Sequence, residues 1–142
     1  MKESDLSLRL SEHFDLGEFY VSKLYPHAFD QCSLDLEGTL KLYWLCLFCL
    51  EKVRDRFGIV FVDSGYRTPE LNELIGGSKT SQHVYFEAAD IVCPHAKGDV
   101  VYDYLVNRMH WEGEVIYYTK RGHVHVAMPN FEVKADHMIV DS

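Results

Sequence analysis

The stretch Ser78-Lys79-Thr80-Ser81-Gln82-His83-Val84-Tyr85-Phe86-Glu87-Ala88-Ala89-Asp90 and the later segment His123-Val124-His125 decide how this chain is interpreted. Four side chains in these two segments are of types that bind zinc: His83, Asp90, His123 and His125. Two imidazoles and one carboxylate, with a fourth position left open, form a ligand set typical of a catalytic zinc site. The sequence therefore predicts such a site if the fold brings the two segments together.

The residues alone leave a second interpretation open. Side chains alternate along a strand, so His123 and His125 point the same way and can share a metal. However, the chain has eight histidines, so one H-x-H pair arises readily without any metal. His83 and Asp90 taken alone also fit a loop residue and a capping carboxylate.

Composition limits the class of protein. The chain has 142 residues, so we expect a single domain over residues 1–142 and a monomer. Its 47% hydrophobic and 25% charged residues are ordinary for a globular protein. The net charge of −8 argues against binding to nucleic acid or to an anionic membrane surface.

No targeting or membrane segment is expected. The opening residues 1–5 are polar, and no apolar run follows them, so we expect synthesis in the cytoplasm without a signal peptide. The longest apolar run, 42–50, is too short to span a bilayer. Cell lysis or packing into a virus particle would be routes to the outside.

The four cysteines do not suggest a zinc or redox motif. Cys46 and Cys49 form a C-x-x-C inside an apolar helical pattern, and no second pair accompanies them. We therefore expect all four, Cys32 and Cys93 included, to be reduced, and the C-x-x-C pair to be buried in the core.

The predicted fold class is α+β. The clearest helix spans 35–57 and ends before Gly58, with its apolar face assigned to residues 36, 40, 43, 44, 47, 50, 53 and 57. Four strands are expected near 59–63, 88–93, 114–118 and 123–128. They should form a small antiparallel sheet packed on that helix, with the zinc site on the open face. The tail from Pro129 has a weak pattern and fits either an edge strand or a frayed end.

Several ordered motifs resemble one known family. They are Ser64-Gly65-Tyr66-Arg67-Thr68-Pro69-Glu70-Leu71-Asn72, Gly76-Gly77-Ser78-Lys79-Thr80-Ser81-Gln82-His83, Ala88-Ala89-Asp90-Ile91 and Val124-His125-Val126. Together they resemble the zinc D-Ala-D-Ala carboxypeptidases, whose relatives include phage L-Ala-D-Glu endopeptidases and which share a fold with the hedgehog signalling domain. The opening Leu10-Ser11-Glu12-His13-Phe14 is similar to the start of the small phage and bacterial branch.

The resemblance implies a role for each matching residue. The zinc ligands would be His83, Asp90 and His125. Arg67 would contact the substrate or the developing oxyanion, unless it only forms a structural salt bridge. His123 would steady the transition state, unless it merely faces solvent. Ser81 and Tyr66 would join Arg67 in contacting the substrate.

Two features depart from the family pattern. The family usually has glycine three residues after the first ligand, where this chain has Phe86, so the loop there must differ or be strained. The family also places a general-base carboxylate a few residues before the last histidine. Residues 118–122 contain no carboxylate, and Tyr118 stands at about that place. The remaining candidate bases are Glu87, Glu112 and Glu114.

The resemblance implies a zinc metallopeptidase that hydrolyses peptidoglycan stem peptides at the cell wall, either carboxypeptidase-like or endolysin-like and associated with a phage. The missing carboxylate supports an alternative, a non-catalytic zinc-binding structural or virion-associated domain of the same fold. The bond cleaved is left open by the sequence.

Overall fold

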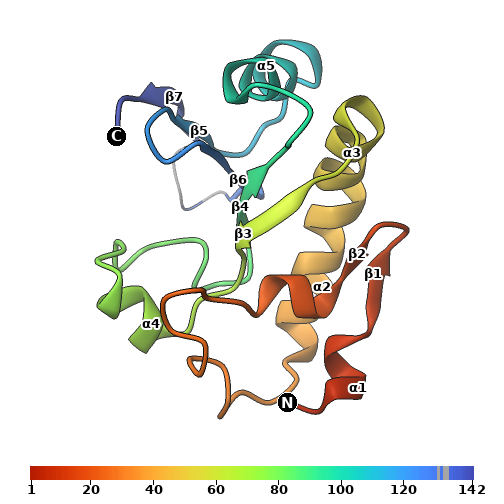
Figure 1. Cartoon of the computed structure of the whole chain (residues 1–142), viewed down its shortest axis with the longest axis vertical. Coiled ribbons are helices and arrows are strands. Elements are labelled where there is room, and N and C mark those ends of the chain that lie inside the picture. The colour runs from red at the N-terminus through yellow and green to blue at the C-terminus, as the bar shows by residue number, and fades with distance from the viewer. Residues whose placement is uncertain (131, 133–134) are drawn as a thin grey trace.

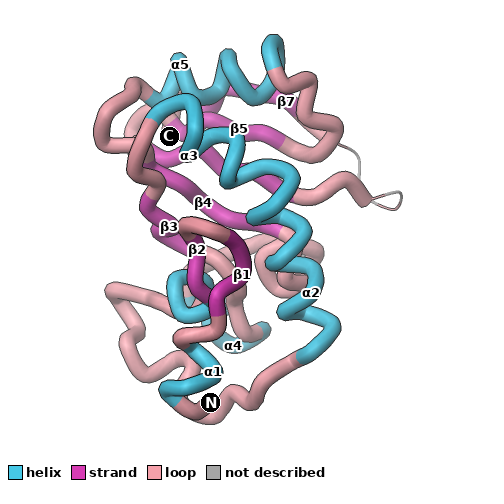
Figure 2. The backbone as a smooth tube through the Cα atoms, turned by 90° about the vertical axis from the view of Figure 1, so that its right-hand side faces the viewer, coloured by secondary structure: helices cyan, strands magenta, loops and turns pink. Residues whose placement is uncertain are grey.

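A five-stranded sheet lies against one long helix, as the computed structural model of residues 1–130, 132 and 135–142 shows (Figures 1 and 2). The helical elements are α1 (Glu3–Leu6), η1 (Leu16–Phe19), α2 (Leu36–Leu45), η2 (Cys46–Leu50), α3 (Glu51–Phe57), α4 (Pro69–Leu74), α5 (Gly98–Asp103) and η3 (Tyr104–Arg108). The strands are β1 (Arg9–Ser11), β2 (Phe14–Asp15), β3 (Phe61–Ser64), β4 (Ala88–Val92), β5 (Val115–Tyr118), β6 (His123–Ala127) and β7 (His137–Val140). Within the described residues, no helix is long and apolar enough to cross a membrane.

The long helix has well-defined ends. Its first turn is capped by Asp35, whose carboxylate accepts the backbone N–H of Gly38 at 2.7 Å. The elements α2, η2 and α3 follow one another without a break, and η2 is a single wider π-helical turn. Gly58 ends the helix with φ of +82°, a conformation that glycine adopts without steric cost. The predicted helix is thus confirmed at both ends.

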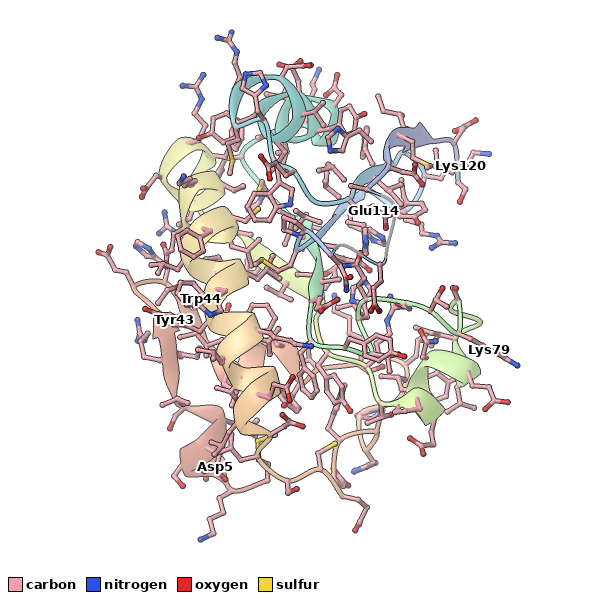
Figure 3. All side chains as sticks on the ribbon, turned by 180° about the vertical axis from the view of Figure 1, so that it is seen from behind. Asp5, Tyr43, Trp44, Lys79, Glu114 and Lys120 are labelled. Atoms are coloured by element: carbon pink, nitrogen blue, oxygen red, sulfur yellow. The ribbon has the colours of Figure 1, made fainter. Side chains whose placement is uncertain are left out.

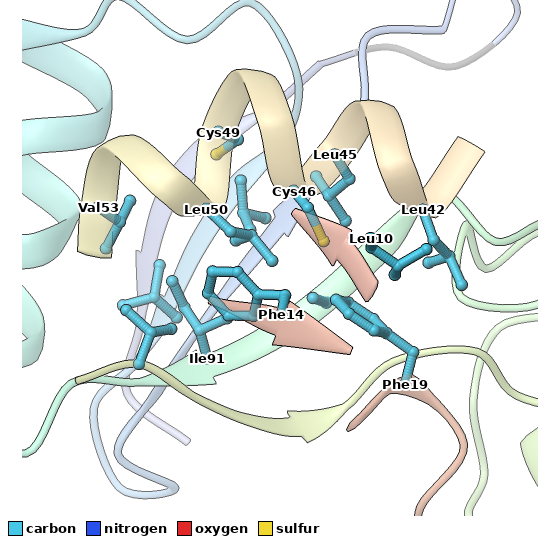
Figure 4. Packing of buried hydrophobic residues seen from close by; sticks show 14 of the residues in the cluster. Leu10, Phe14, Phe19, Leu42, Leu45, Cys46, Cys49, Leu50, Val53 and Ile91 are labelled. Atoms are coloured by element: carbon cyan, nitrogen blue, oxygen red, sulfur yellow. The ribbon is translucent and has the colours of Figure 1, made fainter. Parts of the chain in front are cut away.

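The buried face of this helix differs from the predicted one. The side chains that enter the core are Leu42, Leu45, Cys46, Cys49, Leu50 and Val53 (Figure 4). The predicted positions 36, 40, 43, 44 and 47 are exposed instead, whereas 50 and 53 are buried and Phe57 is partly buried against the core. Both faces of the helix are apolar, so periodicity alone could not choose between them. Trp44 and Phe48 stack on each other on the exposed face at 4.9 Å.

The cysteines behave as expected. Cys46, Cys49 and Cys93 are buried and Cys32 is partly buried, and all four are free thiols. Burial raises the pKa of the Cys93 thiol to about 11, which keeps it protonated at neutral pH.

The main sheet has the order β3-β4-β6-β5-β7. Its first four strands pair antiparallel, as predicted. The edge strand β7 pairs parallel with β5, so the tail adds a strand and the sheet is mixed. A tight hairpin after β6 would place the next strand beside β6, whereas the longer connection carries the chain to the outer edge of β5, where a strand antiparallel to β6 runs parallel to β5.

The two faces of the sheet have different environments. Ala89, Ile91, Val124 and Val126 are buried in the cluster that packs under the long helix. Because side chains alternate along a strand, Asp90, His123 and His125 point to the opposite face. The predicted α+β class is therefore confirmed, and the polar residues of the middle strands lie on the face away from the long helix.

The N-terminal hairpin β1–β2 is tied to the long helix through Glu51. One carboxylate oxygen of Glu51 accepts the Ser11 hydroxyl at 2.6 Å and the His13 backbone N–H at 2.8 Å, and the other lies 2.7 Å from His13 Nδ1. Burial by itself raises the pKa of Glu51, but these hydrogen bonds outweigh it and lower the pKa below the ordinary value of 4.5.

We expect Glu51→Gln to lower the free energy of unfolding by roughly 1–2 kcal/mol at neutral pH, because it weakens two hydrogen bonds to a charged group. Since the folded pKa is the lower one, the stabilisation is complete above the unfolded pKa and is lost as the pH falls through the folded pKa. Urea denaturation of wild type and variant between pH 3 and pH 7 should show the difference shrinking on the acid side. Glu12→Gln is the matched control; a pH-independent difference would contradict this account.

The loop before β4 has a left-handed residue at Phe86, with φ of +61°. This conformation costs a non-glycine residue roughly 1–2 kcal/mol. The ring of Phe86 stacks flat on Tyr66 at 3.9 Å, and Gly38 of α2 leaves room for it on another side. A Cβ atom at position 38 would lie 2.6 Å from the Phe86 ring. The loop thus keeps the strained conformation, and packing of the aromatic ring offsets its cost.

We expect Gly38→Ala to destabilise the protein by roughly 1–3 kcal/mol, because the new methyl group collides with the Phe86 ring. Helix propensity alone would give the opposite sign. In a Phe86→Gly background the same change should be neutral or stabilising. Chemical denaturation of the four proteins gives the double-mutant cycle, and additive effects would show that the collision does not occur.

Candidate metal centre

Three predicted ligands converge on the open face of the sheet. Asp90 on β4 is paired directly with His125 on β6, which places their side chains next to each other. His83 comes from the loop before β4. The atoms His83 Nε2, Asp90 Oδ1 and His125 Nδ1 lie 3.0–3.2 Å from one another. All three residues are buried, and each offers one donor atom to a metal ion.

The orientation of His83 is fixed by the backbone. Its Nδ1 lies 2.7 Å from the carbonyl oxygen of Gly65. A carbonyl oxygen can only accept, so Nδ1 carries the proton and Nε2 presents a lone pair. This is the arrangement by which an outer hydrogen bond prepares an imidazole for metal binding.

His125 is held in the complementary way. Its Nε2 lies 3.0 Å from Glu114 Oε1, while its Nδ1 faces Asp90 and His83. Burial alone lowers the pKa of His125, but the hydrogen bonds to Asp90 and Glu114 raise it to about 9. A metal ion at Nδ1 would therefore have to displace a proton there.

The donor set fits a small divalent cation. Two imidazole nitrogens and one carboxylate oxygen face one another in a buried place, and a metal ion that takes the place of the proton at His125 Nδ1 would find three acceptor atoms there. Ligands at about 2.0–2.1 Å around a tetrahedral zinc ion lie roughly 3.3 Å apart, close to the separations observed here. Two nitrogens and one carboxylate oxygen suit zinc, whereas calcium and magnesium prefer oxygen alone.

Asp90 divides its two oxygens between two partners. Oδ1 faces both imidazoles, whereas Oδ2 accepts from Arg67 Nη2 at 3.3 Å and lies 3.7 Å from His123 Nε2. Burial by itself raises the pKa of Asp90, but the neighbouring imidazoles lower it well below its usual range. Asp90 is therefore an ionised carboxylate that joins the metal centre to Arg67.

The guanidinium of Arg67 is held on three sides. Nε donates to Ser64 Oγ at 3.1 Å, Nη1 to Asn72 Oδ1 at 3.3 Å and Nη2 to Asp90 Oδ2 at 3.3 Å. A guanidinium has five N–H groups, so two remain for another ligand. Arg67 is thus part of a structural salt bridge and still has hydrogen-bond donors to spare.

A cavity of about 290 Å³ opens over the triad. The predicted site residues Arg67, Ser81, Tyr118 and His123 all line it, together with the three ligands. The ring of Tyr118 contacts His123 edge-on at 5.3 Å, and the guanidinium of Arg121 lies 5.0 Å above the same ring. His123 is therefore a cavity residue and does not face bulk solvent.

Tyr66 does not line this cavity, in contrast to the predicted substrate contact. Its ring stacks on Phe86 and also packs near Tyr20 and Phe29. Tyr66 belongs to a motif that resembles the family, but in this chain its ring packs against Phe86, which stands where the family usually has glycine. This placement gives Tyr66 a structural part and does not support the substrate contact.

The three candidate base carboxylates differ in position. Glu87 lies in a neighbouring cavity, where it pairs with Lys41 at 3.4 Å. Glu112 is exposed and lines another hollow beside Trp111. Glu114 alone of the three lines the metal cavity, and its carboxylate is engaged by His125. Figure 3 labels Glu114 on the side of the molecule away from Tyr43 and Trp44.

Two supporting residues were not found from the sequence. Asn72 is buried, accepts from Arg67 and donates its amide N–H to the Ser78 carbonyl at 2.8 Å, which joins α4 to the ligand loop. Gln82 is buried and donates to the Met128 carbonyl at 3.0 Å. Asn72 ends the motif Ser64–Asn72, and no spacing rule links such amides to a metal site.

Comparison with known proteins identifies a family. The family described as Peptidase M15 matches residues 23–127, which is well over half of the chain and includes all three ligands. No curated protein matches the sequence. Peptidases of this family are zinc-dependent, in agreement with the donor set. The family resemblance carried by the motifs is confirmed, and the chain belongs to the Peptidase M15 family.

Proposed function

We propose that this protein is a zinc metallopeptidase that hydrolyses peptide bonds in peptidoglycan stem peptides. The observation that carries the proposal is the convergence of two imidazole nitrogens and one carboxylate oxygen in an open cavity that Arg67 and His123 also line. Buried convergent acceptors beside a cavity large enough for a short peptide are expected of a hydrolytic metal site. The protein would reach this substrate at the cell wall after its release from a virus particle or a lysed cell.

His83, Asp90 and His125 would hold the ion. Bound there, zinc supplies a Lewis acid that polarises a carbonyl and lowers the pKa of water. Arg67, with two N–H groups unused, can bind a substrate carboxylate or a developing negative charge. Its contacts with Ser64, Asn72 and Asp90 fix the guanidinium before substrate arrives, so little reorganisation is required during reaction.

Tyr118 can serve as a proton donor in the same cavity. Burial, followed by the nearby Asp90 charge, raises the pKa of its hydroxyl, so the group stays protonated at neutral pH. A protonated phenol donates a hydrogen bond to a developing oxyanion or to the departing amine. Tyr118 therefore stands at about the position of the missing carboxylate but would donate a proton, whereas a carboxylate would accept one. His123, whose ring contacts Tyr118 edge-on, can donate a ring N–H to the same region.

We expect His83→Ala to reduce bound zinc from near one per chain to near zero and to abolish cleavage of muropeptides, because one ligand and its lone pair are removed. His83→Gln provides a second test that keeps more of the side-chain volume. The matched control is His27→Ala, since His27 is exposed and forms an ion pair with Asp30 away from the metal cavity. Metal content, circular dichroism and product analysis give the result; unchanged turnover in folded His83 variants would refute the proposal.

Tyr118→Phe should lower kcat roughly 10²-fold with little change in KM, since it removes one hydrogen-bond donor and keeps the ring that contacts His123 and Arg121. Tyr117→Phe is the control, because Tyr117 lies on the opposite face of β5, against Gly98. Steady-state kinetics on a stem peptide measure both. Equal kcat values in the two variants would assign the proton donor elsewhere.

The alternative is a zinc-binding domain without catalysis, and one observation favours it: within the described residues, the only glutamate in the metal cavity is engaged by His125. Zinc bound at one per chain with no cleavage of any muropeptide would support this alternative over the peptidase.

A further inference from the structure

Glu114 holds a specific position relative to the third ligand. It immediately precedes β5, and its backbone carbonyl accepts the N–H of Ala127 on β6 at 3.0 Å. Ile116 is paired with His125, so the side chain two residues earlier lies diagonally across from His125 on the same face. The carboxylate reaches Nε2 of His125 at 3.0 Å, and its side chain is 21% exposed. Backbone pairing therefore determines where this carboxylate lies.

The contact selects one form of His125. When a metal ion takes the place of the proton at Nδ1, the imidazole carries one N–H, and because the carboxylate oxygen of Glu114 accepts it, that proton stays at Nε2. The lone pair is then at Nδ1, which faces Asp90 Oδ1 at 3.0 Å and His83 Nε2 at 3.1 Å. Without Glu114 the proton could move to Nδ1 and bond to Asp90, which would block the donor atom.

The two imidazoles of the site are held by different acceptors. His83 donates to a neutral backbone carbonyl, that of Gly65, which no side-chain substitution removes. His125 donates to a charged side chain, which raises the basicity of the ligand and can be varied. Glu114 lies beyond the Nε2 edge of the ring, on the side opposite Nδ1. In this position its Oε1 is engaged by the ring of the ligand.

We propose that Glu114 is a positioning residue that keeps His125 in the Nε2-protonated form and so sets the affinity of the site for zinc. This inference rests on the proposed function only in that His83, Asp90 and His125 bind the metal. It reassigns Glu114 from a candidate general base to a partner of a ligand.

The test measures zinc affinity of the purified chain by competition with a chromogenic chelator. We expect Glu114→Gln, whose amide oxygen still accepts, to weaken zinc binding roughly 10-fold, and Glu114→Leu to weaken it roughly 100-fold. Glu112→Gln is the matched control, because it removes one nearby negative charge from an exposed residue outside the cavity. It should bind zinc as wild type does.

Nitrogen NMR of the zinc-loaded protein gives the second measurement. Wild type should show His125 protonated at Nε2 with slow exchange of that proton, and Glu114→Leu should show faster exchange. Unchanged affinity and exchange in Glu114→Leu would overturn the inference, as would an equal loss in Glu112→Gln. If Glu114→Leu does not fold, the near-isosteric Glu114→Gln decides the question by affinity.

Turnover at saturating zinc separates this inference from the general-base role. A positioning residue leaves the kcat of fully loaded Glu114→Gln within about 10-fold of wild type, whereas loss of a general base lowers it roughly 10²- to 10⁴-fold. The larger loss with unchanged zinc affinity would overturn the inference. Failure of the metal centre itself has a separate signature, which is unchanged zinc content in the His83 variants.

Discussion

The structure depends on one electrostatic constraint, the meeting of three acceptor atoms around Asp90 Oδ1. Two imidazole nitrogens and a carboxylate oxygen lie 3.0–3.2 Å apart in a buried place. Such an arrangement is costly unless a cation or a proton lies between them. Three surrounding contacts hold these groups in place. The Gly65 carbonyl orients the ring of His83, and the Glu114 carboxylate orients the ring of His125. Arg67 pairs with the second oxygen of Asp90.

The sheet can hold these polar side chains close together because one of its faces packs against the apolar core and the other faces the cavity. Val124 and Val126 pack into the apolar core under the long helix, while His123 and His125, which alternate with them along β6, face the cavity. A shift of one residue in strand register would bury the histidines in the core and expose the valines. The stability of the core therefore fixes the register of β6, and with it the spacing of the metal donors to β4.

Sequence patterns predicted those parts that depend on local signals or on a family motif. The long helix was found from its period and from Gly58, and the three ligands came from motif spacing. The buried face of the helix was missed because both faces are apolar, and only the sheet chooses between them. The diagonal contact of Glu114 with His125 also depends on register between β5 and β6, which sequence spacing does not encode.

The two departures from the family pattern have different physical consequences. Phe86 keeps the left-handed conformation expected of glycine, and packing against Tyr66 and Gly38 offsets the strain, so the ligand loop is preserved. Tyr118 stands at about the place where the family pattern has a carboxylate, and this difference does change the chemistry. A protonated phenol donates a hydrogen bond, whereas a carboxylate accepts one. Metal holding and proton transfer are therefore separable in this fold. This chain has the geometry for holding a metal, and it places the phenol of Tyr118 and the imidazole of His123 in the same cavity.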